Sequence, residues 1–204
     1  NTIETSVATA DIILIADNDG DGRGGVIIAP SGFVPSAGNI IIKGSDTLTR
    51  ADVVDSIFVE QDDALNQLQA EGGITLSSNA ATPAGAMLQI DGYVQSGAGG
   101  VSLEAKGDIR AGHIFAGGGA VTLTTVTSGD IFVDAVAAAG NTITIQAAGA
   151  ILELGDDAAA DLTAATLNLK AASGIHGQPT LEVDAQKLSV ESQTGVIDIR
   201  NLNG

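Results

Sequence analysis

A short apolar triplet recurs along the second half of the chain and constrains the fold more than any other feature. Its five copies begin at Val101, Val121, Ile143, Leu167 and Leu188. A second apolar residue follows each triplet after 8 to 10 residues, usually just beyond a glycine. A period in the low twenties is typical of a solenoid, in which one turn of chain cannot bury its own apolar face and must stack on the next. We call each such turn a rung.

The alternation inside each triplet predicts strands that stack in parallel. In the third copy, Ile143 and Ile145 occupy one face of an extended chain, and the polar residues beside them occupy the other. Two-residue hairpin turns are largely missing between the triplets, which disfavours antiparallel pairing. One column of the stack should then contain Leu123, Ile145, Leu169 and Val190.

The composition indicates a thin core of aliphatic side chains. Hydrophobic residues make up 44% of the 204 residues, whereas aromatic residues make up 2% and tryptophan is absent. Val, Ile, Leu and Ala suit an interior that repeats layer by layer. We expect one solenoid domain over residues 1–204, with the clearest repeats in 100–204, and we interpret the chain as a piece of a longer repeat protein.

The first half of the chain repeats less regularly. Strands are predicted at 11–15, 26–28 and 39–43, with a loop over 30–38. Residues 44–71 are expected to form one irregular, loop-rich insertion. Two interpretations of its second part stay open, a strand over 56–60 and a short helix over 61–71, where good helix formers predominate. Both elements can exist together.

The charge of the chain limits its partners. Acidic residues number 25 and basic residues 8, which gives a net charge of −17. Such a polyanion repels nucleic acid and anionic membrane surfaces, and no apolar run approaches the ~20 residues of a membrane span. Divalent cations are the better candidates. The alternative is that the acidic residues only keep a long apolar stack soluble.

One acidic turn carries half of a calcium-binding pattern. Asp17, Asp19 and Asp21 stand at positions 1, 3 and 5 of a calcium loop, and Gly22 stands at position 6. Position 12, which should be a bidentate glutamate, is Ile28. The alternative is a tight acidic turn between two strands. We therefore name Asp17, Asp19 and Asp21 as a candidate calcium site, and we expect no other cofactor.

Two further polar groups are expected to be structural. Asp156, Asp157 and Asp161 are separated by alanines and should lie in a solvated loop. His113 and His176 are the only histidines and stand nearly three rungs apart, so they are not spaced as a metal-binding pair, and His176 should be a surface residue at a turn.

A catalytic site is not expected. An enzyme that cleaves polysaccharides on a parallel β-helix would need carboxylates clustered with basic groups in a groove, and aromatic platforms for sugar rings. The basic residues are scattered singly. Glu104, Lys106, Asp108 and Arg110 alternate along the chain, but a cross-strand charge ladder on one outward face explains them.

The repeat units resemble those of a known class of proteins. Units such as TLTT, TITIQAAGAI and ATLNLKAASGI are similar to the degenerate repeats of filamentous haemagglutinin-type adhesins, and more narrowly to those of very large secreted surface proteins of Gram-negative bacteria. The resemblance implies an all-β fold, a right-handed parallel β-helix (β-solenoid) with rungs of about 20–24 residues. It also implies an extracellular place at the bacterial cell surface.

These observations favour a structural or adhesive module. We expect a stiff spacer whose loops contact a protein or glycan on another cell, with residues 44–71 and 155–165 as the candidate contact surfaces. The alternative is a subunit of an extracellular filament or sheath that assembles end to end with copies of itself, because uncapped sheet edges are templates for pairing. A polysaccharide-degrading enzyme is the least favoured function.

Overall fold

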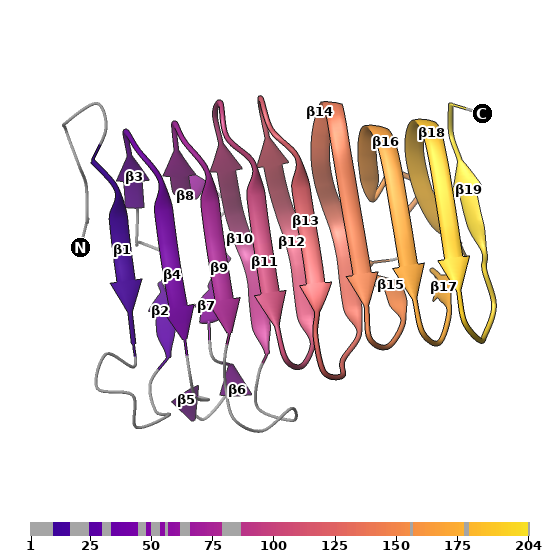
Figure 1. Cartoon of the computed structure of the whole chain (residues 1–204), viewed down its shortest axis with the longest axis horizontal. Coiled ribbons are helices and arrows are strands. Elements are labelled where there is room, and N and C mark those ends of the chain that lie inside the picture. Colours follow the sequence, from indigo (N-terminus) through magenta and orange to yellow (C-terminus); the bar gives the residue numbers. More distant parts are fainter. Residues whose placement is uncertain are drawn as a thin grey trace.

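The chain forms a β-solenoid built from parallel strands (Figure 1). The computed structural model describes residues 10–16, 25–29, 34–44, 48–49, 54–55, 57–61, 66–78, 87–155, 157–177 and 180–203. Every regular element in these ranges is a β-strand, and 17 of the strands join one continuous sheet. The described part of the chain contains no helix that could cross a membrane.

Each rung contributes to three faces of the solenoid. The first face contains β2 (Val26–Ile28), β7 (Ile57–Val59), the starts of β10 (Leu88–Ser96), β12 (Ile109–Ala116) and β14 (Ile131–Ala147), then β15 (Ile151–Glu153) and β17 (Ile175–His176). The second face contains β3 (Val34–Ser36), β8 (Asn66–Ala70), the next parts of β10, β12 and β14, the starts of β16 (Leu162–Ala171) and β18 (Leu181–Ser192), and β19 (Ile199–Asn201). The third face contains β1 (Ile12–Ile15), β4 (Ile40–Gly44), β9 (Ile74–Ser78), β11 (Val101–Ala105), β13 (Val121–Thr125) and the last parts of β14, β16 and β18.

The direction of the strands makes the solenoid right-handed. In Figure 1 the third-face strands run downward in front, and the second-face strands run upward behind them, while the chain advances from left to right. A right-handed crossover is also the general preference for parallel strands. The predicted fold class, a right-handed parallel β-helix, is confirmed.

The core is the stack of inward-facing residues that the triplets predict. Backbone pairing places Leu123, Ile145, Leu169 and Val190 in one column. The first three side chains are buried, and Val190 is half-buried and packs against the core. Because each column continues through neighbouring rungs, the apolar interior runs along the length of the solenoid.

The irregular insertion is smaller than the sequence suggests. The predicted strand over 56–60 is confirmed as β7, but the helix over 61–71 is wrong for its second half, because residues 66–70 form β8, while residues 62–65 lie outside the described residues. Leu68 is fully buried, and its backbone pairs with β3 on one side and β10 on the other. Burial and pairing between rungs therefore outweigh the local helix propensity. The described irregular part is the antiparallel pair β5 (Leu48–Thr49) and β6 (Val54–Asp55), between β4 and β7.

The predicted loop over 30–38 contains a strand that the sequence hides. Pro35 lies inside β3, at a position where a central strand would need a backbone N–H donor. Among the described residues, β3 pairs with β8 alone, so no described strand requires an N–H donor from Pro35 on the other side. Pro35 is the reason why the residue pattern predicts a loop here instead of a strand.

The predicted charge ladder is wrong because the chain turns a corner within it. Glu104 is on β11 of the third face, whereas Arg110 is on β12 of the first face. The Arg110 guanidinium lies 5.4 Å from the ring centre of Phe132, which makes a cation–π contact. At the corner, an oxygen of Asp108 accepts a hydrogen bond of 2.8 Å from the Asp130 N–H of the next rung. Residues that alternate along the sequence no longer point to the same face of the solenoid once the backbone turns a corner between them.

Candidate functional site

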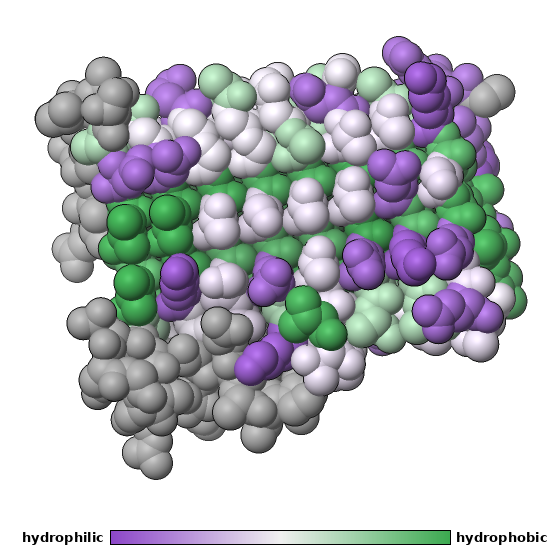
Figure 2. Space-filling model, viewed as in Figure 1, coloured by the Kyte–Doolittle hydropathy of each residue, from purple (hydrophilic) through white to green (hydrophobic). Residues whose placement is uncertain are grey.

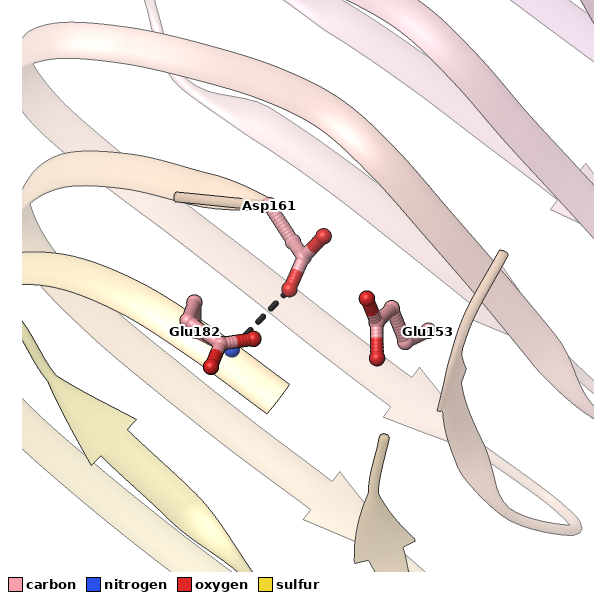
Figure 3. Close-up of side chains that lie close together, drawn as sticks. All are labelled: Glu153, Asp161 and Glu182. Carbon is pink, nitrogen blue, oxygen red and sulfur yellow. Dashed lines mark hydrogen bonds between the residues drawn. The ribbon is translucent and has the colours of Figure 1, made fainter. Parts of the chain in front are cut away.

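Three carboxylates from two consecutive rungs lie together where β15, β16 and β18 meet (Figure 3). Glu153 ends β15, Asp161 directly precedes β16, and Glu182 is the second residue of β18. One carboxylate oxygen of each residue lies within 4.8 Å of those of the other two. We call Glu153, Asp161 and Glu182 the acidic trio.

Backbone pairing explains the position of Asp161. Its N–H donates to the carbonyl of Glu182 at 2.9 Å, and its carbonyl accepts from the N–H of Val136 at 2.8 Å. Asp161 therefore belongs to the ladder of the second face, and it is only 4% exposed. The prediction of a solvated loop is wrong for Asp161. It is confirmed for Asp157, which is exposed, and Asp156 lies outside the described residues.

Glu182 is the cross-strand neighbour of Asp161 and is buried as deeply. It is 3% exposed, although it stands on the outward side of the strand between the inward-facing Leu181 and Val183. Its Oε2 atom is buried and has no hydrogen-bond partner. Its Oε1 atom lies 3.9 Å from Nη1 of Arg200, a side chain that is 61% exposed. Such a long, partly solvated contact compensates a buried carboxylate only weakly.

The surroundings of Asp161 favour its neutral form. The pKa of Asp161 is raised from its usual 3.8 to about 7 in total, and burial is the largest cause. Within that total, the hydrogen bond of 3.0 Å from the Glu182 N–H to Asp161 Oδ2 lowers the pKa, and the negative charges of Glu153, Glu182 and Asp157 raise it. The trio thus concentrates negative charge in a place that solvates it poorly.

A groove of about 390 Å³ adjoins the trio on the first face of the solenoid. Its lining includes Arg110, Phe132, Glu153 and His176. The segment at Gly177 passes directly against Glu153, because a Cβ atom at Gly177 would lie 2.3 Å from Glu153 Oε2. Of the trio, Glu153 lines the groove, while the other two carboxylates are buried.

No protein-family model, curated protein or solved structure matches this chain. Its function is therefore inferred from the fold and from the chemistry of its side chains.

The two histidines lie on different faces of the solenoid. His176 is on β17 of the first face and is half-buried in the groove, so it is a strand residue rather than the surface turn residue expected. His113 is on the second face, where its ring centre lies 4.6 Å from that of Tyr93. The candidate calcium residues Asp17, Asp19 and Asp21 lie outside the described residues, and that site stays a prediction.

The sequence analysis missed Glu153 and Glu182 as site residues. Glu182 had an available signal, because it interrupts an apolar run between Leu181 and Val183, and the rung register places it opposite Asp161 and, one rung earlier, Ala135. Strand alternation alone placed it on the solvent side. The burial of Glu182 depends on its pairing with Asp161. The sequence predicts a loop at Asp161, so this pairing could not be foreseen.

Proposed function

We propose that this chain is a structural or adhesive module of a large secreted or cell-surface bacterial protein, in which the solenoid acts as a stiff spacer. The observation that carries this proposal is the register between rungs. Over the last three rungs, β14, β16 and β18 pair without interruption along Ile143–Ala147, Leu167–Ala171 and Leu188–Ser192. A rod whose sheet and core are continuous resists bending and can hold a contact surface away from its anchor.

A non-catalytic role agrees with the composition of the groove. Glycoside cleavage needs a pair of carboxylates that both reach the sugar. Among the described residues, Glu153 is the carboxylate that lines the groove, whereas Asp161 and Glu182 are 4% and 3% exposed. A substrate in the groove would meet one acidic group, which favours binding or structure over hydrolysis.

An apolar patch on the third face supports the adhesive part of the proposal. Ile13 and Ile15 on β1 point outward and are 56% and 45% exposed, and Ile41 stands beside Ile13 on the next strand. Figure 2 shows this hydrophobic patch at the amino-terminal end of a face whose middle carries residues of intermediate hydropathy and whose carboxy-terminal part carries hydrophilic ones. Exposed apolar groups gathered in this way are typical of contact surfaces.

Binding of coated beads tests the adhesive role. Beads that carry the chain should bind bacterial cells or glycan-coated surfaces, and the double variant Ile13→Asp/Ile15→Asp should reduce that binding at least about fivefold, since apolar contacts dominate such patches. Thr75→Asp, an outward-facing substitution on β9 of the same face, is the matched control and should bind like the parent. Beads that bind no surface, or that bind equally with both variants, would rule out adhesion through this patch.

A second function, self-assembly into a filament, is favoured by a different observation. The part of β18 over residues 187–192 pairs with β16 but has no partner on its other side among the described residues. Leu188, Val196 and Ile197 are 38%, 64% and 50% exposed near this edge. Open parallel edges can pair between copies. Sedimentation at rising concentration separates the two functions, because a spacer stays monomeric and a filament subunit forms ever larger species.

A further inference from the structure

The Oε2 atom of Glu182 is a buried oxygen without a partner, and it belongs to a carboxylate that faces two others (Figure 3). An unpaired buried carboxylate is costly, because water no longer solvates its charge. Native proteins relieve this cost by pairing the carboxylate with a cationic group or a metal ion. Arg200 reaches only the other oxygen, at 3.9 Å, and is itself mostly in solvent. The orphaned oxygen therefore points to a ligand.

The spacing of the trio suits a single ion. Calcium lies 2.3–2.6 Å from its oxygen ligands, so two oxygens on one calcium ion are at most roughly 5 Å apart. The three carboxylate oxygens lie within 4.8 Å of one another, inside that limit. They also come from different segments, namely the end of β15, the start of β16 and the start of β18, so they can surround a point rather than line one side of it.

The donor set selects the kind of cation. All three residues offer oxygen, with no histidine or cysteine in the group, which favours calcium or magnesium over zinc and other softer metals. Magnesium requires a nearly ideal octahedron and gives up its water reluctantly, whereas calcium accepts irregular sets of six to eight oxygens. Three carboxylates from β15, from the residue just before β16 and from β18 form an irregular set.

We propose that Glu153, Asp161 and Glu182 bind one Ca²⁺ ion. The ion would neutralise the buried charge, give Glu182 Oε2 a partner, and fasten residues 157–161 to the next rung. Glu153, which lines the groove, gives the ion a path from solvent. The remaining ligands would be backbone carbonyls or water, as in most calcium sites. This site is separate from the candidate turn at Asp17, Asp19 and Asp21.

Equilibrium dialysis with radioactive calcium tests the proposal on the full chain after removal of bound metal with a chelator. We expect one ion at this site, and Glu182→Gln should weaken its binding at least about tenfold, because the substitution removes a charged ligand. Glu104→Gln is the matched control, since Glu104 is an exposed glutamate on β11 and loses the same charge. The triple variant Asp17→Asn/Asp19→Asn/Asp21→Asn should keep the ion that Glu182→Gln loses.

A second measurement guards against misfolding of the variant. Circular dichroism checks that Glu182→Gln remains β-rich, and if it does not, Asp161→Asn and Glu153→Gln replace it. Hydrogen exchange should show that calcium slows the amides of residues 157–161 in the parent but not in the trio variants. Three outcomes would each overturn the proposal: no calcium bound up to about 10 mM, well above the usual range for protein sites; equal binding by parent and trio variants; or equal affinity for magnesium.

Discussion

The acidic trio should make the stability of the metal-free protein fall as pH rises. A carboxyl group whose pKa is raised on folding binds more protons in the folded state than in the unfolded state, between the two pKa values. For Asp161 these values are 3.8 and about 7. The contribution of Asp161 to the free energy of unfolding should therefore be highest at or below pH ~4, decrease through the window from ~4 to ~7, and level off above it.

The size of this effect follows from the burial of Asp161. A difference of about three pKa units corresponds to at most about 4 kcal/mol, at 1.36 kcal/mol for each unit. Asp161→Asn stays neutral at every pH and can still accept the hydrogen bond that the Glu182 N–H donates. The variant should match the parent near pH ~4 and exceed its free energy of unfolding by up to about 4 kcal/mol near pH ~8.

Urea unfolding of the parent and of Asp161→Asn, with chelator present and at several pH values, measures this difference directly. Other carboxylates titrate in the same range and the net charge is −17, so both proteins share a background pH dependence that the comparison removes. Glu104→Gln controls for the loss of one acidic side chain. If Asp161→Asn keeps the full pH dependence of the parent, Asp161 is not the group that titrates, and the reasoning from its burial fails.

Two further pairs of substitutions test the fold. Ile145→Ala removes a fully buried side chain from the central column and should cost about 2–5 kcal/mol of unfolding free energy, whereas Thr144→Ala on the outward face should cost under about 1 kcal/mol; chemical denaturation measures both. Gly129 has φ +106°, and a Cβ atom there would lie 2.3 Å from the carbonyl carbon of Gly107 in the neighbouring rung. Gly129→Ala should therefore lower the thermal midpoint clearly, with a cost of roughly 1–3 kcal/mol, while Gly155→Ala, with no atom within 4 Å, should change little. Equal effects within either pair would contradict the assigned packing.

The regular half of the solenoid could be predicted from sequence because its signal is local and repeated. Inward-facing Ile143 and Ile145 are surrounded by polar residues, and the same pattern returns one rung later at Leu167 and Leu169, so face and register follow together. In the first half of the chain, prediction from sequence failed at segments whose local preferences oppose the observed fold. Residues 66–70 favour a helix by composition, and Pro35 argues against a strand, yet both segments pair within the sheet.

The sequence by itself determined which side of each strand faces the core, and the tertiary structure alone decided which carboxylates meet. Asp161 and Glu182 are 21 residues apart and follow no shared motif. They become neighbours because the loop after Glu153 returns the chain to the sheet at Asp161, in register with β18 of the next rung. The physical reason is that the alternation of apolar and polar residues indicates only how a side chain is oriented on its own strand. The burial, the partners and the charge state of that side chain depend on how adjacent rungs align.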